Sequence, residues 1–192
     1  ADAAADIEFR FPFGFKELEG IHSRTDFDLS KHQEFSGKKL QYFDTEENKN
    51  YVPYVVETSI GLDRMFLAVL SSSLMDEALE DGSSRTVCKF PKFLAPTKVA
   101  ILPLVKKDGL PDQARKIIKL LQLNYTTSYD EKDSIGKRYR RNDAIGTPYC
   151  ITVDHDSLTD NKYTLRDRDT MTQERLSLNE IKEVLAKEVS MN

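Results

Sequence analysis

Residues 54–70 read YVVETSIGLDRMFLAVL and predict a strand that turns directly into a helix. The stretch opens with β-branched residues typical of a buried strand, and its second half repeats apolar residues at the one-face spacing of an amphipathic helix. Glu57 and Ser59 stand where the strand ends, Gly61 makes the turn, and Arg64 lies in the first helical turn. Free amide N–H groups at a helix start and a guanidinium together favour an anionic ligand such as phosphate. An ordinary surface arginine at a common strand–helix junction has the same pattern, so the residues alone leave both interpretations open.

The spacing Glu57-x-Ser59-x-Gly61-x-x-Arg64 before an apolar helix resembles motif 3 of the class II aminoacyl-tRNA synthetases, in the form EPSxGxxR that glycyl-tRNA synthetases carry. Thr58 stands where that family usually has Pro. The resemblance implies that Glu57 holds the ammonium group of glycine, that Ser59 lines a pocket too small for a side chain, and that Arg64 binds the γ-phosphate of ATP.

Residues 7–13 alternate apolar and polar side chains and predict a half-buried strand, and residues 15–21 predict a second one. Glu17 and Glu19 stand at i and i+2 of the second strand and so are expected to project from one face, where two carboxylates either hold Mg²⁺ or simply meet solvent. The run FGFKELEGIHSRTDFDL (13–29) resembles the glycyl-tRNA synthetase segment FGWxELEGIAxRTDFDL, which implies that Glu17 belongs to an ATP–Mg²⁺ site. The full set of implied substrate residues is Glu57, Thr58, Ser59, Ile60 and Gly61 for glycine, and Glu17, Leu18, Gly61, Leu62, Asp63 and Arg64 for ATP.

Composition narrows the class of protein. The chain has 192 residues, of which 39% are hydrophobic and 31% charged, with a net charge of −4. These fractions are typical of globular proteins. Because the net charge is negative, the protein is not basic overall, and contact with nucleic acid would require a local basic patch. Two cysteines far apart offer neither a zinc pattern nor a disulfide framework, so a reducing, cytoplasmic compartment is expected. No apolar run is long enough to span a membrane.

The pattern of the chain changes near 91–96, where two prolines in six residues predict a connector between a domain at 1–93 and another at 97–192. An acidic loop is expected at 76–85. In the second domain a continuous apolar run at 99–105 predicts a strand covered on both faces. Strands are also expected at 125–129, 149–153, 163–170 and 173–176, and helices at 110–123, 134–145 and after the capping box at 177–180. The order of these elements predicts an α/β domain with a mixed sheet.

A local basic cluster lies at 132–141, where five cations accompany one acid and Tyr139 is placed to stack on a base. A solvated helix face fits the same charges. The segments SIGKRYRRNDAIGTPY (134–149) and LRDRDTMTQ (165–173) resemble the anticodon-binding domain of glycyl-tRNA synthetases. This chain departs from that pattern at Ala144, where the family usually has Glu. The residues implied for tRNA contact are Lys137, Arg138, Arg140, Arg141, Arg166 and Arg168.

The resemblance covers essentially the whole chain and implies a class II (α+β) architecture: the last part of an antiparallel catalytic sheet, then an α/β anticodon-binding domain. Motifs 1 and 2 do not appear, so we expect the chain to correspond to the C-terminal half of the enzyme and not to complete the reaction alone. The implied parent is a homodimer that uses ATP and Mg²⁺ to join glycine to tRNA(Gly). The alternatives are a non-catalytic nucleic-acid-binding subunit of the mitochondrial DNA polymerase accessory type and a free-standing tRNA-binding module.

Overall fold

The computed structural model describes residues 2–190 and forms two compact units, Ala1–Ser71 and Ser72–Asn192. The predicted connector at 91–96 lies within the second unit, so the division into domains at 93–97 stays a prediction. Among the described residues, no helix is both long enough and apolar enough to cross a membrane.

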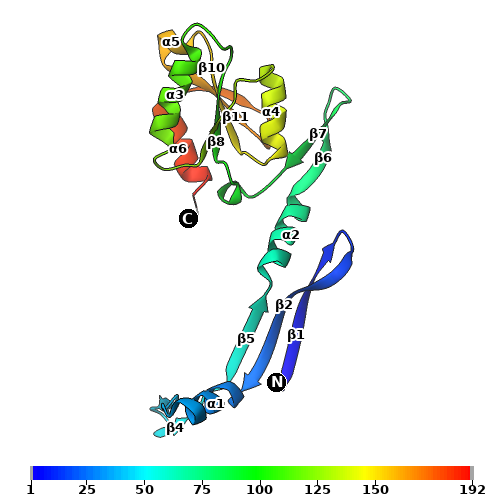
Figure 1. The fold of residues 1–192 in the computed structure, drawn as a ribbon, viewed down its shortest axis with the longest axis vertical. Helices are drawn as coiled ribbons and strands as arrows, with labels where there is room; N and C mark the ends of the chain where they lie inside the picture. Colours follow the sequence, from blue (N-terminus) through cyan, green and yellow to red (C-terminus); the bar gives the residue numbers. More distant parts are fainter. Residues whose placement is uncertain (1, 191–192) are drawn as a thin grey trace. The chain divides into compact units, whose positions relative to one another are not determined.

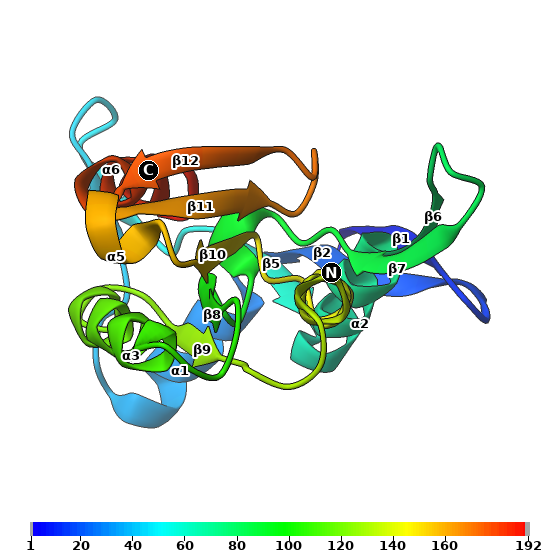
Figure 2. The same cartoon turned by 90° about the horizontal axis from the view of Figure 1, so that it is seen from above.

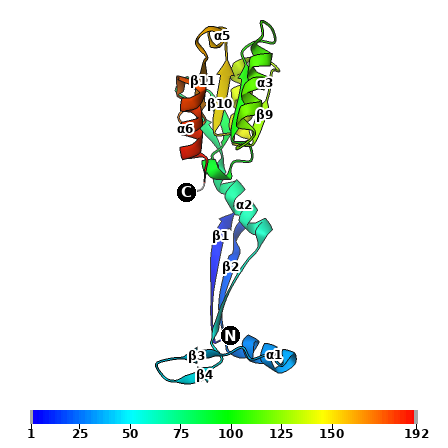
Figure 3. The same ribbon diagram turned by 90° about the vertical axis from the view of Figure 1, so that its left-hand side faces the viewer.

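The first unit is built on an antiparallel sheet of three strands in the order β1-β2-β5. The long ribbon of β1 and β2 is seen in Figure 3, and β5 pairs with the far side of β2. A helix and a small hairpin occupy the segment between β2 and β5, and a second helix follows β5. The bounds are β1 Ala3–Phe11, β2 Gly14–Thr25, α1 Phe27–Ser36, β3 Tyr42–Asp44, β4 Lys49–Tyr51, β5 Val55–Ile60 and α2 Leu62–Ser73.

The expected strand–turn–helix at 54–70 is present, but the strand is longer than predicted. Strand β5 continues to Ile60 because β2 supplies a partner for each of its residues, ending with Glu19 opposite Ile60. Glu57 and Ser59 therefore lie inside the strand, not in the turn after it. As residues i and i+2 of a strand, they project from the same face.

The second unit is an α/β domain whose five-stranded sheet has the order β12-β11-β10-β8-β9 (Figure 2). Strand β8 runs parallel to β9 and β10, whereas β11 is antiparallel to β10 and β12, so the predicted mixed sheet is confirmed. Helices α3 and α6 cover one face of this sheet and α4 the other (Figure 1). The bounds are β8 Val99–Pro103, α3 Leu110–Leu121, β9 Thr127–Tyr129, α4 Ile135–Ala144, β10 Tyr149–Val153, α5 Ser157–Asp160, β11 Lys162–Asp167, β12 Gln173–Ser177 and α6 Leu178–Glu188.

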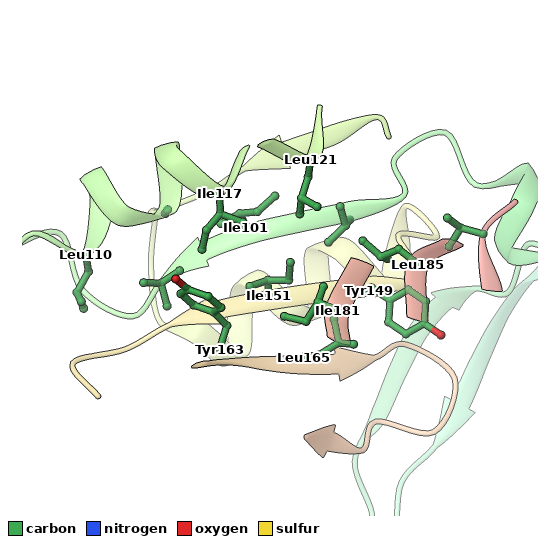
Figure 4. Close-up of a cluster of buried hydrophobic side chains, with 14 residues drawn as sticks. Ile101, Leu110, Ile117, Leu121, Tyr149, Ile151, Tyr163, Leu165, Ile181 and Leu185 are labelled. Carbon is green, nitrogen blue, oxygen red and sulfur yellow. The ribbon is translucent and has the colours of Figure 1, made fainter. Parts of the chain in front are cut away.

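The core of this unit lies between the sheet and helices α3 and α6. Ile101 and Ile151 from the central strands meet Ile117 of α3 and Ile181 of α6, all with 0–1% exposure (Figure 4). A smaller cluster on the other face packs Ala100, Leu102 and Cys150 against α4. Every residue of β8 is buried, so the prediction of a strand covered on both faces is confirmed for 99–103, although the strand ends two residues before the predicted 105. Every residue of β10 is buried as well. The predicted capping box also forms, and in it the Ser177 hydroxyl accepts from the Glu180 N–H.

The segment predicted as an acidic loop is instead largely a hairpin. Strands β6 (Leu74–Ala78) and β7 (Ser84–Cys88) pair in antiparallel fashion, and only 79–83 remains as the turn. The strands form because β7 has a buried face: Arg85 and Val87 are 2% and 0% exposed, and β7 packs beside α4 (Figure 1). A one-turn helix, η1 (Lys92–Leu94), then leads into β8.

Candidate functional site

A shift in strand register decides which side chains share a face in the first unit. Ile7 pairs with Glu19, but the next residue, Glu8, pairs with Glu17, so Leu18 is an extra residue in β2. Consecutive residues of β1 point to opposite faces, and therefore Glu17 and Glu19 do too. The expectation that both carboxylates project from one face is wrong, because it assumed a regular strand.

The same shift places Glu17 on the face that carries Glu57 and Ser59. Gly20 pairs with Ser59 and His22 pairs with Glu57, so these four residues share one face of the sheet. Glu17 belongs to this face because Glu8, its partner, lies two residues from Asp6, the partner of Gly20. We call the surface formed by Glu17, Gly20, His22, Glu57 and Ser59 the Glu57 face.

The imidazole of His22 lies against the backbone of Gly20 on this face. A Cβ atom added at Gly20 would be 2.8 Å from His22 Cε1, a separation that real side chains do not adopt. A glycine at position 20 leaves this ring where it is. The His22 ring therefore covers Gly20 on the Glu57 face.

Glu57 has a cationic neighbour that the sequence pattern did not reveal. Arg24 forms a two-pronged pair with Asp28, with Nε–Oδ2 and Nη2–Oδ1 distances of 2.8 and 2.9 Å. This hydrogen-bonded pairing raises the pKa of Arg24 and lowers that of Asp28. Arg24 Nε also lies 3.4 Å from Glu57 Oε2, and the Glu57 side chain is 44% exposed. Arg24 is thus held by Asp28 with its charge directed at the Glu57 carboxylate.

Arg64 is connected to the same part of the sheet. Its Nη1 donates to the backbone carbonyl oxygen of Glu17 at 2.6 Å, which ties the first turn of α2 to the bulge in β2. Gly61 lies beside this side chain, since an added Cβ there would be 3.6–3.8 Å from the Arg64 stem. The structure therefore brings Arg64 next to Glu17 and leaves both side chains exposed.

The remaining predicted substrate residues divide between the faces and the helix start. Thr58 and Ile60 pair with Ile21 and Glu19 and so lie on the face opposite Glu57. Leu62 and Asp63 open α2, and Leu18 is the extra residue of the bulge. No group of three or more His, Cys, Asp or Glu side chains that could hold a metal ion occurs among residues 2–190. Glu17 alone fits Mg²⁺ that is bound mainly by phosphate, an arrangement that needs only one or two protein carboxylates.

In the second unit, the cations predicted to contact tRNA fall into two groups. Lys137, Arg140 and Arg141 are exposed on α4, whereas Arg138, Arg166 and Arg168 are 2–5% exposed. Arg141 pairs with Asp130 at 2.6 Å and with Asp133 at 2.9 Å. The structure thus leaves Lys137 and Arg140 as the cations of α4 that point to solvent without an ion pair among the described residues.

Arg138 is a buried guanidinium whose acceptors are carbonyl groups. It donates to Pro103 O at 2.6 Å, to Leu104 O at 3.1 Å and to Asp130 O at 3.3 Å, while its Nε has no partner within residues 2–190. These bonds fasten α4 to the carboxyl end of β8 and to the loop after β9. Tyr139, expected to stack on a base, instead packs on the sheet and shares a 2.6 Å hydrogen bond with Thr152.

Arg166 and Arg168 also have partners within the protein. Arg166 makes two bonds to the Asp143 carboxylate, at 2.7 and 3.0 Å, and its guanidinium lies 4.8 Å from the ring centre of Tyr139. Arg168 donates to Gly146 O and Phe90 O and pairs with Asp169. Contact of these arginines with tRNA stays a prediction, and their present bonds hold α4, β7 and β11 together.

The residue that organises this cluster, Asp143, was not singled out in the sequence. It is fully buried and receives bonds from Arg166 and from Arg85 Nη1, which lies 3.0 Å from Asp143 Oδ2. Arg85 also pairs with Glu77 within the β6–β7 hairpin. The sequence signal that could have found this cluster is its isolated charges. Asp143 is a lone acid at the end of a basic helix and Arg85 a lone cation in its strand, and each requires a partner if it is buried.

Residues 98–188 match the family described as the anticodon binding domain. The glycine–tRNA ligase of Chlorobaculum tepidum is 51% identical over 186 residues, covering 97% of this chain and 39% of the ligase. The ligase of Staphylococcus saprophyticus is 53% identical over 190 residues, covering 98% and 41%. The chain thus spans about two fifths of the length of the curated relatives it matches.

A solved structure also resembles the fold. The crystal structure of the RNA binding domain of threonyl-tRNA synthetase from Cryptosporidium parvum superposes with a TM-score of 0.71 at 19% identity, covering 98% of this chain and 44% of the other. This likeness supports the mixed α/β architecture. The resemblance seen in the sequence is confirmed: along nearly its whole length the chain is related to the glycine–tRNA ligases, also called glycyl-tRNA synthetases, and its residues 98–188 belong to the anticodon-binding domain family.

Proposed function

We propose that this chain is part of a glycyl-tRNA synthetase, which activates glycine with ATP and transfers it to tRNA(Gly). In this proposal the first unit contributes to the activation site and the second binds the tRNA anticodon. The observation that carries the first half is the shared face: Glu17, Glu57 and Ser59 project from one side of the β1-β2-β5 sheet, and Arg64 is bonded to the backbone of Glu17.

The Glu57 face suits a small zwitterion. The Glu57 carboxylate is the natural partner of the glycine ammonium group, and Ser59 would line a pocket too small for a side chain. Steric rejection is effective for glycine because no smaller amino acid competes with it. Arg24, held by Asp28, keeps a positive charge 3.4 Å from the Glu57 carboxylate.

Arg64 and Glu17 suit the nucleotide. Arg64 has donors beyond the one it gives to the Glu17 carbonyl, and its position at the start of α2 favours phosphate. Glu17 would supply a carboxylate ligand to Mg²⁺, which neutralises phosphate charge when ATP is bound. Glu57, Arg24 and Arg64 act by electrostatic positioning of charged substrates, and no covalent nucleophile is required.

The second half of the proposal rests on the exposed cations of α4. Lys137 and Arg140 are one helical turn apart and share a face, as phosphate contacts require. We expect the chain to bind tRNA(Gly) more tightly than duplex DNA in a filter-binding assay. Equal affinity for both would favour the alternative of a non-catalytic nucleic-acid-binding subunit.

The activation site is tested in a whole enzyme, because this chain covers only part of its relatives. In the ligase of Chlorobaculum tepidum, the segment equivalent to residues 1–71 is replaced by residues 1–71 of this chain. Glycine-dependent ATP–pyrophosphate exchange by this chimera is then measured. We expect the chimera to be active, and Glu57→Gln to lower the exchange rate about a hundredfold, since a charge-assisted contact to the ammonium group is lost. Glu46→Gln is the matched control, because Glu46 is exposed and has no ion pair among the described residues. A fully active Glu57→Gln chimera contradicts the proposed role.

A further inference from the structure

Helix α4 carries a narrow cationic strip, defined here as Lys137 and Arg140. Both side chains are exposed, and neither makes an ion pair among residues 2–190. The neighbouring Arg141 is turned to one side of the strip by its pairs with Asp130 and Asp133. The strip therefore presents two free cations to a ligand.

The first border of the strip is the acidic loop before α4. Asp130 and Asp133 lie beside Arg141, at 2.6 and 2.9 Å from its guanidinium. Burial acts to raise the pKa of Asp130, but hydrogen bonds from the Lys132 N–H and from Arg141 outweigh it and lower that pKa. Two carboxylates share the one guanidinium of Arg141, so its charge does not cancel both of theirs along this side of α4.

The second border is the turn of the β6–β7 hairpin, where Glu80 and Asp81 are exposed. The buried pair of Arg85 with Asp143 joins the hairpin to α4, and β7 packs beside this helix (Figure 1). Hydrogen bonds from Ser83 lower the pKa of Asp81, and the charge of Arg140 lowers it further. The charge of Arg140 therefore acts on Asp81 of the turn.

We propose that the turn acids Glu80 and Asp81 and the loop acids Asp130 and Asp133 are repulsive borders that restrict RNA on α4 to a single strand. The proposal rests on the proposed function, in which α4 contacts tRNA. A single strand brings one line of phosphates, which Lys137 and Arg140 accommodate between the borders. A duplex brings two lines of phosphates, and its second backbone would meet carboxylates. Repulsion against the wrong ligand adds discrimination that attraction alone does not provide.

The experiment compares a short single-stranded RNA with the duplex it forms with its complement, using fluorescence anisotropy and the full chain. The test variant is Glu80→Gln/Asp81→Asn. The control is Asp112→Asn/Glu183→Gln, which removes the same two charges from α3 and α6 on the opposite face of the sheet. Glu80→Lys alone serves as a second variant, because the Asp81 carboxylate has bonds to Ser83 that hold the turn.

We expect the test variant to bind the duplex about three- to tenfold more tightly and the single strand less than about twofold more tightly, with a difference that shrinks as salt is raised. Glu80→Lys should act in the same direction, and the control should match the wild type. An equal rise for both RNAs, or no rise for the duplex, overturns the borders while the proposed function stands. A wild-type chain that binds neither RNA overturns the proposed function and the borders together.

Discussion

Arg85 and Asp143 form an ion pair in which neither side chain has any exposure to solvent, with 3.0 Å between Nη1 and Oδ2. Asp143 also holds Arg166 by two bonds, so two buried guanidinium groups share one carboxylate. Removing that carboxylate leaves Arg166 without its counter-charge and leaves Arg85 with Glu77 alone. We expect Asp143→Asn to destabilise the second unit by about 3–5 kcal/mol.

Because the chain has two units, this loss is measured by hydrogen exchange at β10 and β11 amides, which report on the second unit alone. The control is Asp156→Asn, since Asp156 is exposed and has no ion pair among the described residues. A loss of less than about 1 kcal/mol in Asp143→Asn would mean that burial of the pair contributes little.

The β6–β7 hairpin is expected to be an indispensable part of the second unit. A chain starting at 98 retains Asp143 and Arg168 but loses Arg85 and the Phe90 carbonyl that bind them. We therefore predict that a fragment starting at Ser72 gives a well-dispersed amide NMR spectrum. The fragment starting at 98 should be markedly less stable to urea. Equal stability of the two fragments would place the domain boundary near 93–97 after all.

Gly146 is predicted to tolerate no side chain. Its φ of +81° is unfavourable for other residues, and an added Cβ would lie 2.6 Å from Phe90 Cδ2 and 3.0 Å from the Cys88 carbonyl oxygen. We expect Gly146→Ala to cost about 1–3 kcal/mol of unfolding free energy. Gly136, inside α4, has open space around it, so Gly136→Ala should be neutral or stabilising by up to about 1 kcal/mol. Thermal unfolding of the two variants in parallel distinguishes strain at Gly146 from a general effect of alanine.

Hydrophobic pattern predicted the centre of the second unit well, because β8 and β10 are buried on both faces and α3 and α6 on one. The runs at 99–103 and 149–153 and the capping box at Ser177 are local signals, and each appears as an element in the structure. The hairpin at 74–88 was missed because its burial depends on Arg85, a charged residue. Its partner Asp143 is 58 residues away, and periodicity carries no information about such a pair.

The candidate site shows the same limit in a different form. Residue types indicated Glu17, Glu57, Ser59 and Arg64, but their common face depends on one extra residue in β2. A bulge reverses the face of every side chain beyond it, and nothing in the run KELEG announces one. The six cations assigned to tRNA likewise looked equivalent in sequence. Only the structure separates the exposed Lys137 and Arg140 from the buried Arg138, whose acceptors are carbonyl groups of residues far along the chain.

Asp154 is expected to make the second unit sensitive to acid. Partial burial acts to raise its pKa, but hydrogen bonds from Arg175 and Ser157 overcome burial and lower the pKa to about 2. A carboxyl whose pKa is lower in the folded state stabilises the protein above its unfolded pKa of about 3.9. That stabilisation is lost as the pH falls from about 4 to about 2, and amounts to about 1–2 kcal/mol after allowance for partial exposure.

The variant Asp154→Asn tests this prediction, because it cannot titrate and its amide bonds Arg175 only weakly. Unfolding by urea is followed between pH 2 and pH 7, and the stability difference between wild type and variant should be largest near neutrality and vanish towards pH 2. Arg175 keeps its pair with Asp160 at 3.0 Å in the variant, so the loss at neutral pH reflects Asp154 alone. A difference that is constant across this range would show that Asp154 acts through its shape and hydrogen bonds, and that its charge contributes nothing.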